Sequence, residues 1–292
     1  MALFSKIHTI LHISWKDLKY NVKHLRLRNA SESLQEVEYS DLRMYCHMLD
    51  KGINNSSFEP GHSVKVLEKA RYLSDKLRPI YGADREFRWI DDVIERFEKS
   101  QINGVPELRN SLPHEYDEQE ITEYTSFIKR RTSCRNFLQK PIPEDVIRKI
   151  IDIAVDAPNG CCRQVVRYYY SQDKALIDDI TPRIDGLTNF TNVQCLVCVA
   201  AETSFYDLVD RNLRFIDASL SVENFLLGAS LYGIYGTICN FFHARKADIS
   251  YCRKRIGIKE TEDIVFFMAI GYPVTIPEKP ARRDLEVFFK KV

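Results

Sequence analysis

Three side chains that can bind an anion stand close together near the middle of the chain. Arg131, Ser133 and Arg135 supply two guanidinium groups and a hydroxyl group within the sequence RTSCR. A guanidinium group presents N–H donors in a planar fork, so it binds phosphate and carboxylate groups through paired hydrogen bonds. The spacing predicts an oxyanion site, although the same residues are also typical of a basic helix end on the surface that binds nothing.

A second polar segment, residues 157–164 with the sequence APNGCCRQ, follows a stretch with helical spacing. The stretch opens with Pro143, and its apolar residues include Ile147, Ile150 and Ala154. This pattern predicts a helix, because proline is favoured in the first turn and the apolar residues recur every three or four positions. The helix would carry the chain from the basic cluster to the polar segment.

The elements that must position these residues follow from the hydrophobic pattern. Before residue 110, apolar residues recur at helical spacing, as in 66–77 and 87–97. After residue 117, helical patterns alternate with runs rich in β-branched and aromatic residues at 166–170, 193–201 and 264–272. The run 193–201 is almost wholly apolar, which predicts a strand buried on both faces. A long, mostly apolar helix is predicted over 215–232.

We therefore predict an α+β fold with two parts. Residues 1–112 form an N-terminal helical extension, and residues 117–292 form the main domain, with a central mixed or antiparallel sheet flanked by helices. Turn-forming residues at 103–106 and 112–113 mark the boundary between the two parts.

The composition argues against several classes of protein. The formal net charge of +1 is unlike the strong basic bias of a dedicated nucleic-acid binder. No run approaches the ~20 apolar residues of a membrane span, and the first fifteen residues lack the pattern of a signal peptide. We expect a cytoplasmic protein whose eight cysteines are free thiols.

Segments across the main domain resemble the FMN-dependent nitroreductase family, whose opening reads roughly R-R-S-x-R-x-F, then P-I-P, then a-P-S-x-x-N-x-Q-P. Three later segments resemble the same family, in the same order. They are the helix that contains Asn224 and ends before Gly233, the strand that runs into Gly271-Tyr272-Pro273, and the basic segment 279–286. The resemblance covers residues 126–289.

The resemblance implies a nitroreductase-like fold and an FMN held at a homodimer interface by both subunits. Members of this family accept hydride from NADH or NADPH and pass electrons to nitro groups, quinones or other acceptors. The flavin carries this chemistry, and no metal is implied. The implied cofactor residues are Arg131, Thr132, Ser133, Arg135, Pro158, Asn159, Gly160, Cys162, Gln164, Asn224, Lys279, Arg282 and Arg283. The loop 158–164 would reach the flavin of the other subunit.

The loop departs from the family pattern at several positions. Asn159 stands where the family has serine, Cys162 where it has asparagine, and Val165 where it has proline. A thiol is a poor substitute for an amide donor, so we expect a flavin contact to be lost at Cys162. An alternative interpretation is therefore a nitroreductase-like scaffold that has lost redox activity and serves as a binding or assembly protein.

Two further patterns leave alternatives open. His47 to Ile53 resembles an H-x-x-E-K-G-L motif of longer nitroreductase-like proteins, several of them encoded among polysaccharide-biosynthesis genes. His47 and Lys51 lie one helical turn apart and could share an anion, but a helix C-terminus capped by Gly52 explains the same residues. The pairs Cys161-Cys162 and Cys195/Cys198 are interpreted as small apolar residues rather than redox or metal sites.

Overall fold

The computed structural model describes residues 2–55, 57–109, 111–242 and 244–291. The α-helices are α1 (Ala2–Arg28), α2 (Ser31–Ile53), α3 (Val64–Tyr81), α4 (Arg85–Asn103), α5 (Glu118–Arg130), α6 (Glu144–Val155), α7 (Lys174–Ile180), α8 (Leu213–Leu231) and α9 (Lys246–Ile256). The strands are β1 (Val166–Ser171), β2 (Cys195–Glu202), β3 (Tyr235–Asn240) and β4 (Glu262–Gly271). Short 3₁₀ helices are η1 (Gly160–Cys162), η2 (Thr181–Arg183), η3 (Leu187–Asn189), η4 (Leu208–Asp210) and η5 (Leu285–Val287).

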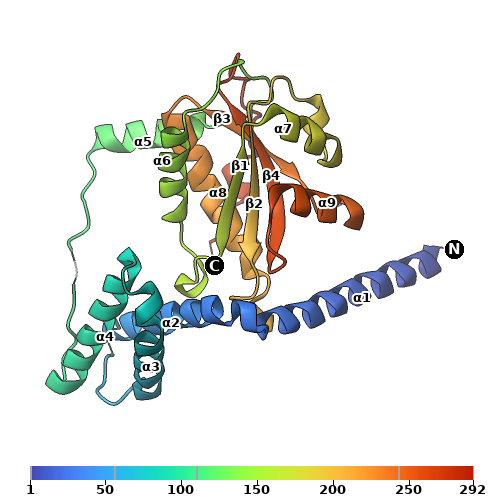
Figure 1. Ribbon diagram of the computed structural model, residues 1–292. Helices are drawn as coiled ribbons and strands as arrows, with labels where there is room; N and C mark the ends of the chain where they lie inside the picture. The colour runs from blue at the N-terminus through green and yellow to red at the C-terminus, as the bar shows by residue number, and fades with distance from the viewer. Residues whose placement is uncertain (1, 56, 110, 243, 292) are drawn as a thin grey trace.

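One sheet organises the main domain (Figure 1). Within the described residues it has the strand order β1-β2-β4-β3, and each neighbouring pair is antiparallel. All eight residues of β2 are buried, because β2 lies inside the sheet and both of its faces are covered. The fold is α+β, as predicted, and the sheet is antiparallel.

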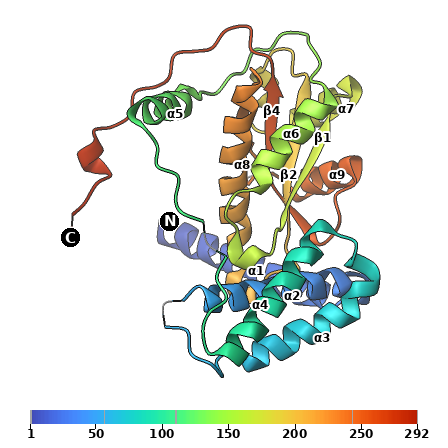
Figure 2. The same cartoon turned by 90° about the vertical axis from the view of Figure 1, so that its left-hand side faces the viewer.

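Helices cover both faces of the sheet. Helices α6 and α8 pack on one face, where Ile150, Val197 and Phe225 belong to one apolar core. Helices α7 and α9 lie on the other face, where Ile177 and Cys198 belong to a second core. Figure 2 shows α8 on one side of the strands and α7 and α9 on the other. The alternation of side chains along β2 explains how one strand contributes to both cores.

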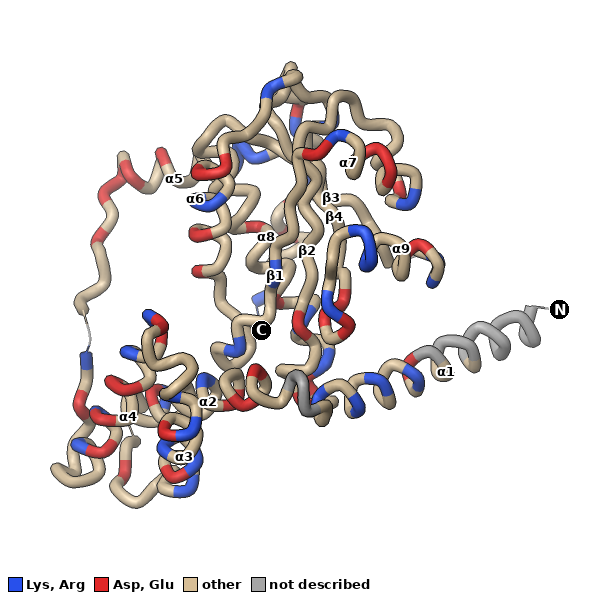
Figure 3. Tube along the Cα trace, in the orientation of Figure 1, with Lys and Arg blue, Asp and Glu red and all other residues tan. Residues whose placement is uncertain are grey.

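The N-terminal helices have a core of their own. Helices α2, α3 and α4 pack around residues such as Leu49, Leu77, Ile90 and Phe97, and an extended segment leads from α4 to α5 (Figure 1). Charged residues are frequent along α3 and α4, as Figure 3 shows. The division into domains at residues 112 and 117 stays a prediction. No helix of the described residues is long and apolar enough to cross a membrane.

Several predicted elements are confirmed, with corrections at their ends. The strands predicted at 166–170, 193–201 and 264–272 are β1, β2 and β4, and the predicted long helix is α8. Gly233, with φ +70, ends α8 through N–H bonds from Gly233 to Ser230 and from Ile234 to Ala229, the hydrogen-bond pattern of a glycine cap.

Two predictions about helix ends are wrong, and one strand was not predicted. Pro143 is the N-cap of α6 and lies outside its first turn. Gly52 lies within α2, which ends at Ile53 with Asn54 as its C-cap. Strand β3 has six residues and borders the sheet, so two of them, Ile238 and Asn240, are exposed.

Candidate functional site

The basic segment after α5 runs in an extended conformation beside β3. Thr237 donates from its hydroxyl group to the carbonyl oxygen of Cys134 at 2.8 Å, and Ser133 forms a parallel bridge with Gly236. Thr132 and Cys134 are buried. Because side chains alternate along an extended chain, Arg131, Ser133 and Arg135 point to the opposite side, away from the core. The backbone thus brings together the three side chains that the sequence indicated.

Two further contacts locate this cluster. The Arg131 guanidinium lies 3.8 Å from a carboxylate oxygen of Glu223 on α8, and the side chain of Arg131 is 19% exposed. The Lys279 ammonium group donates to the carbonyl oxygen of Lys129 at 3.0 Å, in the last turn of α5. The C-terminal tail therefore brings a cation to the same helix end. Arg282 and Arg283 follow on this tail, and both are exposed.

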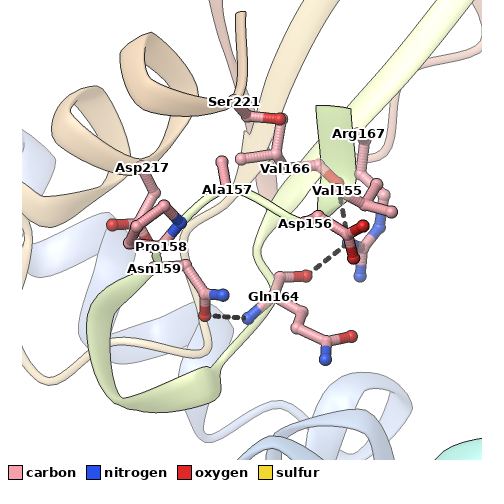
Figure 4. A pocket seen from close by; sticks show the side chains of 10 residues that line it. All are labelled: Val155, Asp156, Ala157, Pro158, Asn159, Gln164, Val166, Arg167, Asp217 and Ser221. Atoms are coloured by element: carbon pink, nitrogen blue, oxygen red, sulfur yellow. Dashed lines mark hydrogen bonds between the residues drawn. The ribbon is translucent and has the colours of Figure 1, made fainter. Parts of the chain in front are cut away.

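The polar loop lies at the other end of α6 and is fixed by its own hydrogen bonds. The Asn159 side-chain oxygen accepts the Gln164 N–H at 3.0 Å, as Figure 4 shows. The Gly160 N–H donates to both carboxylate oxygens of Asp217, at 3.0 Å each. A Cβ atom on residue 160 would lie 3.0 Å from Leu213 Cδ1. The residue at position 160 thus needs to be small for the loop to approach α8.

The loop forms one wall of an open depression of about 250 Å³. Its lining comes from the end of α6, the loop, β1 and α8, and the residues are Val155, Asp156, Ala157, Pro158, Asn159, Gln164, Val166, Arg167, Asp217 and Ser221 (Figure 4). Asp217 is buried and also accepts a hydrogen bond from the Tyr206 hydroxyl group. Burial raises the pKa of Asp217, while its bonds from Tyr206 and Gly160 oppose that rise.

One chain does not bring the two groups of predicted residues together. Along the chain, the 12-residue helix α6, about 18 Å long, lies between them. They also contact different sides of α8, at Glu223 and Asp217, which are about 9 Å and about 240° apart around the helix axis. Asn224 is partly buried on the side of Asp217, two turns further along the helix.

The basic cluster and the whole polar loop fall within a stretch that is similar to a known family. Residues 128–189 match the profile of the Nitroreductase family. Over this stretch the chain is similar to the nitroreductase family. A relative in Archaeoglobus fulgidus, whose name assigns it to the NADH dehydrogenase/NAD(P)H nitroreductases, is 24% identical over 157 residues, which are 52% of this chain and 87% of the relative. A similarly named protein of Methanothermobacter thermautotrophicus is 24% identical over 161 residues, 54% of this chain and 80% of the relative.

Solved structures share the nitroreductase fold. A nitroreductase-like protein from Streptococcus mutans aligns with a TM-score of 0.52 and 15% identity over 59% of this chain and 99% of that protein. The NADPH:FMN oxidoreductase of Vibrio harveyi aligns with a TM-score of 0.50 and 17% identity over 57% of this chain and 76% of that protein. At these identities the likeness supports the fold alone.

The cysteines predicted to be small apolar residues have different surroundings. Cys195 and Cys198 are buried in β2, and no group of His, Cys, Asp or Glu side chains in the described residues is arranged to hold a metal ion. Cys162 lies with its sulfur 3.5 Å from His47 Nδ1 on α2, and it does not line the depression beside Asn159. A flavin contact from Cys162 stays a prediction.

Sequence reasoning missed the buried residues that hold the loop. Asp217 and Tyr206 anchor Gly160, and Arg43 of α2 donates to the loop carbonyl groups. Asp217 carried a signal in the sequence, since a carboxylate in a mostly apolar helix calls for a partner. Arg43 carried none, because it lies in a helix with many other charged residues.

Proposed function

We propose that this protein is a homodimeric, FMN-dependent NAD(P)H oxidoreductase. The observation that carries the proposal is the basic cluster. Arg131, Ser133 and Arg135 share the outer side of an extended segment, and Lys279 lies at the same helix end. A phosphate dianion calls for more than one cation, and charge-assisted hydrogen bonds are the strongest that side chains make. These residues therefore suit the phosphate and ribityl groups of FMN, with Arg282 and Arg283 adding positive charge from the tail.

The loop is proposed to meet the flavin ring of the partner subunit. Pro158, Asn159 and Gln164 line the depression beside α8. When bound, FMN would accept hydride from NADH or NADPH and pass electrons to a small-molecule acceptor. The chain's own part is to bind the phosphate, to orient the ring through the loop and to shield one side of the ring from water.

Uncovered apolar surface supports the proposed homodimer. On α8, Ile216, Leu220 and Leu231 recur at helical spacing and are 53%, 43% and 62% exposed. None of the 13 residues of α5 is buried, and Ile121 and Ile128 are about half exposed. Large apolar patches on a surface usually mark an interaction site. A second copy packed on α8 would cover this surface and bring a loop towards the basic cluster of its partner.

Flavin reconstitution tests the proposed function. The purified chain is mixed with FMN, and binding is followed by the quenching of flavin fluorescence and by the yellow colour retained after gel filtration. We expect saturable binding of one FMN per subunit and FMN-dependent oxidation of NADH or NADPH. A colourless protein that neither quenches FMN nor oxidises either nicotinamide would contradict the proposal.

A further inference from the structure

Helix α2, from the N-terminal helices, donates hydrogen bonds to the backbone of the polar loop. Arg43 donates from Nε to the carbonyl oxygen of Cys162 at 3.3 Å and from Nη2 to the carbonyl oxygen of Arg163 at 2.8 Å. One guanidinium group thus satisfies two successive loop carbonyls. Only 6% of the Arg43 side chain is exposed, and its charge is balanced by Glu86 of α4 at 3.2 Å. A buried guanidinium held in this way fixes the backbone that it contacts.

The loop returns an arginine of its own to α2. Arg163 is 3% exposed, and its Nη1 donates to Asp41 at 2.8 Å and to the Ser40 hydroxyl at 3.2 Å. Asp41 also pairs with Arg28 of α1. Helix α2 and the loop therefore each contribute one arginine that bonds to the other, and a carboxylate balances each charge. Removing one donor leaves buried acceptors unpaired, which is costly.

The conformation of the loop calls for such a restraint. Cys161, Cys162 and Gln164 have φ values of 53°, 55° and 52°. Residues with a Cβ atom seldom adopt this left-handed conformation, and it persists only where the surroundings enforce it. The contacts from Arg43 fall on the carbonyl group of Cys162, which is one of these residues, and on that of Arg163, which lies between Cys162 and Gln164.

Helix α2 also contacts a side chain of the loop. His47 lies one turn beyond Arg43 on α2, and its Nδ1 is 3.5 Å from the sulfur of Cys162. Asn159 and Gln164 remain turned towards the depression (Figure 4). Burial raises the pKa of the Cys162 thiol. The thiol therefore stays protonated and slow to react while α2 covers it.

We propose that α2 is the positioning element of the polar loop, with Arg43 and His47 as its positioning residues. Without them the loop would leave its left-handed conformation, and Asn159 and Gln164 would lose their orientation. The effect on flavin affinity rests on the proposed function, whereas the effect on the loop does not. The N-terminal helices would thus contribute to the site by holding the polar loop in the conformation proposed to bind the flavin.

The experiment compares Arg43→Met with two other variants. Arg43→Lys keeps the charge but loses the fork of donors, and Arg71→Met removes an exposed arginine of α3 that pairs with Glu98 away from the loop. Hydrogen exchange of the loop amides, thiol labelling with a disulfide reagent and FMN fluorescence titration are measured on the full chain. Exchange in β2 and β4 reports whether the fold is intact.

We expect Arg43→Met to raise exchange of the loop amides by about tenfold or more, as local opening does. Two thiols should label quickly instead of one, since Cys161 is exposed and Cys162 becomes so. The Kd for FMN should rise by about tenfold, equivalent to about 1.4 kcal/mol, with Arg43→Lys intermediate and Arg71→Met unchanged. His47→Leu should expose Cys162 to labelling without changing hydrogen exchange in β2 and β4. This variant tests the proposal if Arg43→Met does not fold.

Unchanged loop exchange and unchanged labelling in both Arg43→Met and His47→Leu would overturn the proposal. So would equal effects in Arg71→Met, because that variant leaves the loop contacts in place. If the wild-type chain binds no FMN, the proposed function fails, and exchange and labelling still decide whether α2 positions the loop. If wild type binds FMN and the loop opens in Arg43→Met with no change in Kd, the loop is positioned by α2 but does not touch the flavin, which refutes its proposed role in the site.

Discussion

Replacing Arg131 with alanine tests the assignment of the basic cluster most directly. If Arg131 donates to the FMN phosphate, its loss should weaken binding by about 1.5–3 kcal/mol, the range for hydrogen bonds to charged groups. At about 1.4 kcal/mol per factor of ten, the Kd should rise roughly 10- to 150-fold. The fold should survive, because the ion pair with Glu223 spans 3.8 Å and Glu223 is 56% exposed. A pair that is this long, with one exposed partner, contributes less than about 1 kcal/mol to the free energy of unfolding.

The assay is FMN fluorescence titration at two salt concentrations, with urea unfolding of the same samples. Arg130→Ala serves as the matched control, since Arg130 is exposed at the end of α5 and adjoins Arg131. We expect Arg130→Ala to change the Kd by less than about twofold, because an exposed charge acts only through the screened field. Arg282→Ala should resemble Arg131→Ala. Unchanged flavin affinity in both Arg131→Ala and Arg282→Ala would refute the phosphate assignment.

Three further predictions concern assembly, packing and pH. The proposed homodimer should bury more than about 2,000 Å² of surface. Leu220→Glu on α8 should convert it into monomers by light scattering, whereas Ile102→Glu, at an exposed residue of α4, should not. A wild-type monomer at micromolar concentration would contradict the dimer. Gly236→Ala should lower the free energy of unfolding, measured in urea, by about 1–3 kcal/mol, because its Cβ would lie 2.6 Å from Ile270 and 2.7 Å from the Ala269 carbonyl oxygen. Gly52→Ala is the control, because its Cβ would lie 3.6 Å from Phe97, and it should raise the free energy of unfolding by about 0.5–1 kcal/mol. Burial raises the pKa of Tyr168 from 10.0 to about 12. The contribution of Tyr168 to the free energy of unfolding is therefore complete below pH 10, and up to about 2.7 kcal/mol of it is lost as the pH rises to about 12. Tyr168→Phe should make the free energy of unfolding less sensitive to pH between about 10 and 12, and an unchanged slope would contradict the burial argument.

The fold could be predicted where the sequence pattern is long and uniform. The apolar run at β2 indicated a strand covered on both faces, and the glycine after α8 indicated where that helix ends. Strand β3 could not be predicted in the same way, because an edge strand of six residues with exposed Ile238 and Asn240 leaves a weak pattern. Its place in the sheet depends on pairing with β4, which lies later in the chain.

The candidate site likewise has a part that could be predicted from local sequence and a part that could not. The cluster of Arg131, Ser133 and Arg135 could be predicted because its spacing is local and its alternation with Thr132 and Cys134 belongs to one extended segment. The contacts of the loop with α2 could not, because Arg43 and Arg163 are 120 residues apart. Pairing over such a distance depends on the tertiary fold and leaves no periodic signal in the sequence.

The departure of the loop from the nitroreductase pattern at Cys162 can be explained by its contact with α2. At Cys162, where the family has an amide side chain, the structure places a thiol against His47. An asparagine there would bring two N–H donors and an oxygen acceptor into a half-buried contact that offers one histidine nitrogen. Cysteine fills the same space with only a weak donor. The loop residue and the helix that covers it are therefore matched to each other, so the substitution is explained by packing against α2 and does not by itself indicate a loss of flavin chemistry.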